Sequence, residues 1–197
     1  MLDKETLKRL NEIESAAYRC VIDEHYFEIV TGNTKRDFWT VVQNALGDGV
    51  CLYWFHLFGN HKDDLHYSKF FSRPDVLAVG KEYSKEAVKK RILAVIGYDD
   101  EEYNKFREEV KCCRDKFVAH REIGAIGIYP NINICRLMVE ELRVVLSELV
   151  EKCKAKAPDD DELFWWHHYY SSQNNKWLYN KCLMLYNTRV EDSSDLK

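Results

Sequence analysis

Residues 103–121 read YNKFREEVKCCRDKFVAHR, and two rows of side chains in this segment predict a long amphipathic helix. At about 100° per residue, the first row falls on one face and is apolar up to its last member. It consists of Tyr103, Phe106, Val110, Cys113, Phe117 and His120. The second row is almost wholly basic and consists of Arg107, Lys111, Arg114, Val118 and Arg121. A core-facing row that ends in an imidazole, beside a row of cations, is suited to holding and cleaving a phosphodiester.

The flanking residues set the limits of this helix. Asp99 or Asp100 can begin it, because acidic residues favour the positive end of the helix dipole. Gly124 and Pro130 stop it soon after His120. His120 therefore belongs near a helix C-terminus, where the dipole favours the protonated imidazole.

The pattern in the rest of the chain also predicts helices. Caps and breakers predict helices over 3–31 (capped by Asp3), 34–59 (a capping box at Thr34 and Asp37), 84–97 (capped by Ser84), 131–158 (Asn131 to Pro158) and 160–189, the last as one helix or two. Residues 61–83 predict a long loop with a short turn at 65–71. No run alternates as a strand does, so the predicted fold is an all-α, single-domain bundle of five or six helices. It covers 1–189 and is followed by a short, acidic, frayed tail over 190–197.

Two details of these helices can be tested by a structure. Gly47 and Gly49 lie inside a predicted helix, where each costs about 1 kcal/mol relative to alanine, so we expect a close approach of another helix or a kink there. In the helix over 84–97 the predicted inward row is Val88, Ile92 and Val95.

Composition limits the class of protein. The chain has 197 residues, 46% of them hydrophobic, which fits one well-packed domain. The net charge of −4 means that nucleic-acid binding needs a local basic patch. Seven cysteines without a CxxC spacing predict reduced thiols in a reducing compartment. There is no apolar leader or membrane-length run, so we expect a soluble, cytoplasmic protein that does not enter a membrane.

Residues 113–122, CRDKFVAHRE, resemble the signature of the HEPN superfamily. That signature is an arginine, a polar residue directly after it, and a histidine at the end of a helix. Here these positions are Arg114, Asp115 and His120. The sequence of this segment is similar to the abortive-infection and uncharacterised HEPN-like branch, and residues 51–54, CLYW, fit that branch less specifically. One departure is Glu122, because members controlled by a nucleotidyltransferase antitoxin carry a tyrosine there.

The resemblance implies a helical homodimer and, in many members, a metal-independent endoribonuclease without a cofactor. It also implies RNA as the substrate and roles in phage defence, toxin–antitoxin systems or RNA processing, with an antitoxin or regulatory protein as a partner. His120 then serves as general acid and base, Arg114 as phosphate ligand and Asp115 in a weak orienting role. Arg107, Lys111 and Arg121 guide the RNA backbone.

Helix geometry agrees with a composite site. Arg114 and His120 are separated by about 120° around an ideal helix and roughly 9 Å along it, so one chain does not aim both at one atom. A two-fold dimer repeats both groups around one cleft.

Other interpretations of the same residues remain open. His120 can cap a helix end, Arg114 can belong to a solvated face paired with glutamates, and Asp115 can pair with Lys111. The chain can then be a non-catalytic HEPN-type scaffold that binds a nucleotide, RNA or a partner protein, or an interaction module whose motif is fortuitous.

Three further groups carry weaker signals. The segment 60–66, NHKDDLH, suggests a metal site less strongly than a solvated loop, because its spacing fits no zinc pattern. The aromatic residues around 164–177 suit packing better than base stacking. Cys112 or Cys113 as a nucleophile lacks an oriented base. No metal ligand is therefore assigned.

Overall fold

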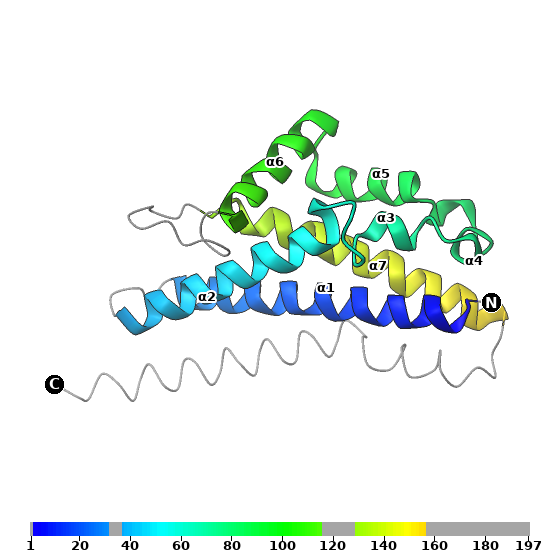
Figure 1. The fold of residues 1–197 in the computed structure, drawn as a ribbon, viewed down its shortest axis with the longest axis horizontal. Coiled ribbons are helices and arrows are strands. Elements are labelled where there is room, and N and C mark those ends of the chain that lie inside the picture. Colours follow the sequence, from blue (N-terminus) through cyan, green and yellow to red (C-terminus); the bar gives the residue numbers. More distant parts are fainter. Residues whose placement is uncertain (1, 32–36, 116–128, 157–197) are drawn as a thin grey trace.

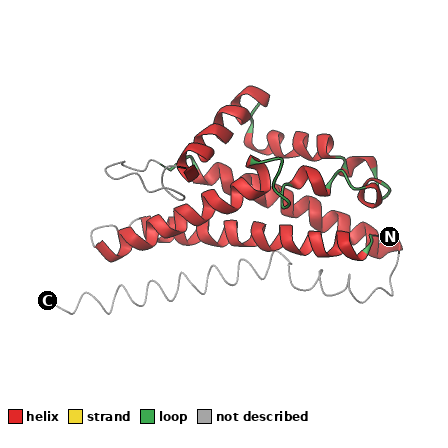
Figure 2. Ribbon diagram, in the orientation of Figure 1, coloured by secondary structure: helices red, strands yellow, loops and turns green. Residues whose placement is uncertain are grey.

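A computed structural model describes residues 2–31, 37–115 and 129–156, and every regular element in these ranges is helical (Figures 1 and 2). The elements are α1 (Lys4–Thr31), α2 (Asp37–Trp54), the π-helical η1 (Phe55–Gly59), α3 (Tyr67–Phe70), α4 (Pro74–Leu77), the 3-10 helix η2 (Lys81–Tyr83), α5 (Lys85–Ile96), α6 (Asp100–Cys113) and α7 (Ile132–Lys156). The predicted all-α bundle is confirmed for these ranges. The short elements α3, α4 and η2 occupy residues 61–83, where the sequence predicts a loop. The predicted helix over 160–189 and the tail over 190–197 lie outside the described residues.

The long helices pack in two groups. α1 lies along α2 and also packs against α7, which runs antiparallel to it (Figure 1). α5 packs on α7, and α6 packs on η1 and the end of α2. The helix that carries the candidate motif therefore rests on the C-terminal end of α2.

Local side chains explain where the helices begin and end. Asp3 accepts a hydrogen bond from the backbone of α1, and Ser84 does the same for α5. Asp99 forms a capping box with Glu102 at the start of α6. Gly97 ends α5 at a φ of 70°, a left-handed conformation that glycine adopts without strain. These caps confirm the predicted helix starts at Asp3, Ser84 and Asp99, whereas the predicted capping box at Thr34 and Asp37 includes Thr34, which lies outside the described residues.

The buried hydrophobic residues form one cluster to which all the long helices contribute. One predicted inward residue is wrong: Val95 is 46% exposed. The inward face of α5 instead follows steps of four residues through Val88, Ile92 and Ile96, which pack against the core.

The two glycines of α2 are sites of close approach, as predicted. A Cβ at Gly47 would lie 2.7 Å from ring carbons of Tyr129, and one at Gly49 would meet the carboxylate of Asp23 on α1. Larger side chains at either position need the neighbour to move.

Candidate functional site

α6 presents the predicted apolar face to the core. The buried members of that row are Tyr103, Phe106, Val110 and Cys113. Beyond Cys113 the chain continues through Arg114 and Asp115 in a wider, π-helical turn. The candidate motif therefore starts where the core-facing helix changes its winding.

The guanidinium of Arg114 is held between a ring and a carboxylate. Its central carbon lies 3.8 Å from the ring centroid of Phe55 in η1, a cation–π contact. Arg114 Nε donates a hydrogen bond of 2.8 Å to Asp115 Oδ1, and Nη2 donates a second one to the same oxygen. The Arg114 side chain is 27% exposed, so its remaining N–H groups are the part available to a ligand.

The other described cations of the basic row have partners on their own helix. Arg107 Nη2 lies 3.5 Å from Glu108, and Lys111 Nζ lies 3.3 Å from the same carboxylate. Surface pairs of this kind contribute only about 0–1 kcal/mol, so a phosphate can displace them. The alternative in which Asp115 pairs with Lys111 is wrong in this structure, since Asp115 binds Arg114.

Phe55 is positioned by the junction of α2 and η1. Trp54 packs edge-on against Phe106 of α6, with ring centroids 5.4 Å apart. The carbonyl of Phe58 accepts a hydrogen bond of 3.1 Å from Tyr103 Oη, which ties η1 to α6 again. Carbonyls at a helix end lack intrahelical hydrogen-bond partners, and Tyr103 supplies one to the carbonyl of Phe58. The same contacts hold η1, and with it the ring of Phe55, against Arg114.

Tyr129 anchors the chain on α2 again just before α7. Its hydroxyl lies 2.9 Å from the carbonyl of Asn44 and 2.9 Å from Asp48 Oδ1. Burial raises the pKa of Tyr129, and the bond to Asp48 adds to this, so the phenol stays protonated and can donate. Both described ends of the segment that contains His120 thus rest on the continuous α2–η1 helix.

His120 and Arg121 lie outside the described residues. Among the remaining predicted site residues, the structure brings Arg114 and Asp115 into contact and places Lys111 about one turn and Arg107 about two turns earlier on α6.

Sequence reasoning missed Phe55, which supports Arg114. The signal that could have found it is weak: an aromatic residue at the end of a long helix.

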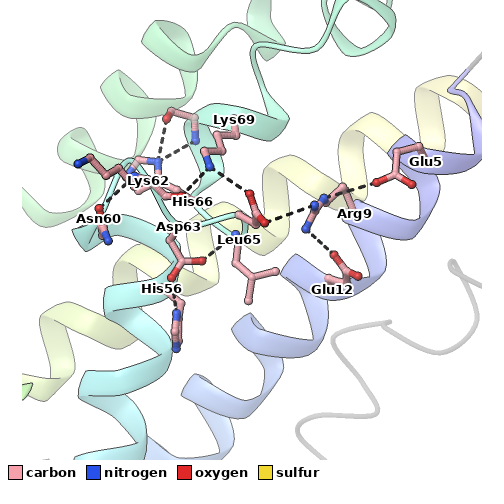
Figure 3. Close-up of polar contacts among 12 residues, drawn as sticks. Glu5, Arg9, Glu12, His56, Asn60, Lys62, Asp63, Leu65, His66 and Lys69 are labelled. Atoms are coloured by element: carbon pink, nitrogen blue, oxygen red, sulfur yellow. Dashed lines mark hydrogen bonds and ion pairs between the residues drawn. The ribbon is translucent and has the colours of Figure 1, made fainter. Parts of the chain in front are cut away.

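A second polar cluster joins His56 of η1 to the segment 60–66 that follows η1 (Figure 3). His56 Nδ1 lies 2.5 Å from Asp63 Oδ2, and Asp63 Oδ1 accepts a bond from the backbone of Leu65. Partial burial on its own raises the pKa of Asp63, but the bonds from His56 and Leu65 outweigh it and the pKa is lowered. The pair fastens the segment 60–66 to the end of η1.

The same segment contains a buried imidazole. His66 is fully buried; its Nδ1 lies 2.7 Å from Ser68 Oγ and its Nε2 lies 3.2 Å from the carbonyl of Phe58. Burial, aided by the nearby His61, lowers the pKa of His66 to about 4. The interpretation of 60–66 as a solvated loop is therefore wrong for His66, which is part of the core.

Within the described ranges, no group of three or more His, Cys, Asp or Glu side chains is arranged to hold a metal ion. None of the helices in those ranges is long and apolar enough to cross a membrane. Comparison with protein-family models, curated proteins and solved structures finds no match for this chain.

Proposed function

We propose that the chain is a HEPN-like, metal-independent endoribonuclease that acts as a homodimer in the cytoplasm. The observation that carries the proposal is the setting of Arg114. It is the first residue of the Arg-polar-x4-His motif, stands at the end of α6, and is held flat on Phe55 with part of its guanidinium exposed. A planar, fixed guanidinium suits bidentate binding of a phosphate better than a mobile ammonium does.

The chemistry assigned to the site is cleavage by the neighbouring 2′-hydroxyl. One imidazole removes the 2′-proton, the 2′-oxygen attacks phosphorus, and a second imidazole protonates the leaving 5′-oxygen. The two copies of His120 in a dimer supply the base and the acid. Arg114 stabilises the charge that builds up on the phosphate oxygens, and Asp115 orients Arg114.

The basic row extends the site along the RNA backbone. Arg107, Lys111 and Arg121 contact successive phosphates, with the weak pairs to Glu108 exchanged for RNA. The resemblance places such an enzyme in phage defence, in a toxin–antitoxin pair or in RNA processing, with an antitoxin or another regulatory protein as its partner.

A second candidate function is a non-catalytic scaffold that binds a nucleotide, RNA or a partner protein through the same surface. The pair between Arg114 and Asp115 favours it, because a carboxylate against the guanidinium repels phosphate and fills two of its donors.

An RNA cleavage assay with excess EDTA separates the two. The parent should produce cyclic-phosphate ends, and His120→Ala and Arg114→Ala should each lose at least about 100-fold in rate, typical for loss of an acid–base group or an oxyanion donor. Lys85→Ala, at an exposed lysine on α5, is the matched control and should cleave like the parent.

The non-catalytic scaffold is supported if the parent and all three variants leave RNA uncut, whether or not they bind it. Cleavage that persists in His120→Ala would exclude the proposed site while leaving a ribonuclease elsewhere in the chain.

A further inference from the structure

Two thiols from different helices are in contact next to Arg114 of the candidate site. Cys51 of α2 and Cys113 of α6 are both buried, and their sulfur atoms are 3.6 Å apart. They are 62 residues apart in the chain, and both are free cysteines. Cys51 lies four residues before Phe55, and Cys113 directly precedes Arg114, so the thiol pair and the cation–π pair are consecutive contacts between the same two helices.

The other cysteines of the described ranges have different surroundings. Cys20 donates to the backbone carbonyl of Val50, at 3.7 Å, and Cys112 is exposed. The contact between Cys51 and Cys113 joins α2 to α6 through their sulfur atoms.

The two thiols are not equivalent. Cys51 donates the hydrogen bond and Cys113 accepts it, which lowers the pKa of Cys113 although burial opposes the shift. For Cys51 the same hydrogen bond, together with burial, raises the pKa. Because the thiolate is the nucleophile, the lowered pKa makes Cys113 the better nucleophile of the pair.

We propose that Cys51 and Cys113 are a modification site that a hydroperoxide converts into a reversible disulfide. The Cys113 thiolate attacks the terminal peroxide oxygen, the O–O bond breaks, and the alkoxide or hydroxide leaves and takes up a proton. The Cys51 sulfur then attacks the resulting sulfenic acid at sulfur, the S–O bond breaks, and water leaves with the Cys51 proton. In sum, two thiols are oxidised and one peroxide is reduced to an alcohol, or to water, with one further water released.

The geometry requires little movement. A disulfide has an S–S length of about 2.05 Å, so the sulfurs must approach by about 1.5 Å. Cys113 is the last residue of α6 before the π-helical turn at Arg114 and Asp115. The bond fixes the end of α6 to α2 at the residue next to Arg114. Its formation requires no RNA cleavage, so the proposal stands or falls independently of the proposed function.

Peptide mapping of the intact chain tests the site. The reduced protein is treated with hydrogen peroxide until Cys112 is oxidised, alkylated in denaturant, and digested with trypsin without reductant. We expect a crosslink between residues 37–62 and residues 112–114, which dithiothreitol removes.

Single variants assign the sulfur. Cys112→Ser should keep the crosslink, whereas Cys113→Ser and Cys51→Ser should lose it, with helical circular dichroism to show that each variant is folded. The presence or absence of the crosslink in the parent protein decides the proposal even if a variant does not fold. Failure to find the crosslink once Cys112 is oxidised overturns the proposal, and so does a crosslink that depends on Cys112 instead of Cys113.

Discussion

Arg114 has two neighbours with opposite effects on phosphate binding. The ring of Phe55 holds the guanidinium flat without neutralising it, while Asp115 fills two of its donors and cancels its charge. Phe55 orients the guanidinium, and Asp115 competes with phosphate for its donors. Which effect is larger decides whether Arg114 supports catalysis or only binding.

Replacing Asp115 by asparagine separates these effects. Asp115→Asn should bind single-stranded RNA more tightly at low salt. The slope of log K against log salt concentration should steepen by the amount expected for about one additional phosphate contact. If Asp115 orients Arg114 for catalysis, the cleavage rate should fall at the same time. Fluorescence anisotropy over a salt series measures binding.

The matched control is Glu101→Gln, at an exposed carboxylate in the first turn of the same helix. Unchanged affinity and an unchanged salt slope in Asp115→Asn would show that Arg114 does not contact phosphate.

Gly47 and Gly49 differ in what lies against them, and this difference predicts opposite results for the same substitution. Gly47 faces the ring of Tyr129, whose hydroxyl donates its one proton between the carbonyl of Asn44 and Asp48 Oδ1, whereas Gly49 faces the rotatable carboxylate of Asp23. Alanine gains about 1 kcal/mol of helix propensity at both positions. Overpacking costs typically 1–3 kcal/mol where the neighbour cannot move.

Gly47→Ala should therefore lower the free energy of unfolding by up to about 2 kcal/mol, and Gly49→Ala should leave it unchanged or raise it. Urea unfolding followed by circular dichroism measures both. Equal losses in the two variants would contradict the assignment of Tyr129 as the rigid neighbour.

At the level of whole elements, the contact between α1 and α7 is unusual in burying charged groups. Glu14 accepts a hydrogen bond of 2.7 Å from Arg143, and Glu24 accepts one of 3.2 Å from Arg136. Burial raises the pKa of Glu24 to about 8; the nearby Glu28 adds to the rise, while Arg136 opposes it. His25 on α1 and Glu140 on α7 are the other titratable groups in this environment.

The raised pKa of Glu24 fixes the sign of its pH dependence. Between the ordinary glutamate value of about 4.3 and pH 8 the folded chain holds a proton that the unfolded chain releases. The stability from Glu24 is therefore complete below about pH 4 and is lost as the pH rises through 8.

Glu24→Gln keeps the shape of the protonated carboxyl and removes this titration. The unfolding free energy of the parent should fall relative to Glu24→Gln as the pH rises from 5 to 8, by at most about 1.4 kcal/mol per pH unit, and then level off. Urea titrations at several pH values measure the difference. The control is Glu151→Gln, at an exposed residue of α7; similar curves for the two variants would contradict the prediction.

Element boundaries were largely predictable from sequence, because they depend on neighbouring residues. Asp3, Ser84 and Asp99 begin the helices that they were expected to begin. The π-helical turns at η1 and at Arg114 were not predicted, since one widened turn leaves no periodic signal. Pro74 opens the short α4 within residues 61–83, where a loop was expected, and its missing N–H costs nothing at that position.

At the scale of the whole molecule, the sequence indicated the all-α class but not the pairing of helices. Glu14 binds Arg143, which is 129 positions later in the chain, and Glu24 binds Arg136, 112 positions later. Phe55 contacts Arg114, 59 positions later, and no local pattern reveals such contacts. The same limit applies to the candidate site: the motif indicates Arg114 and Asp115, but their contact with each other and with Phe55 depends on tertiary packing.

The antiparallel contact of α1 with α7 also constrains how the chain is made. Arg136 and Arg143 leave the ribosome more than a hundred residues after their glutamate partners. At typical synthesis rates of about 5–20 residues per second, α1 spends on the order of ten seconds without the helix that neutralises its carboxylates. During that interval Glu14 and Glu24 remain hydrated, which keeps the nascent helix compatible with water until α7 emerges to cover it.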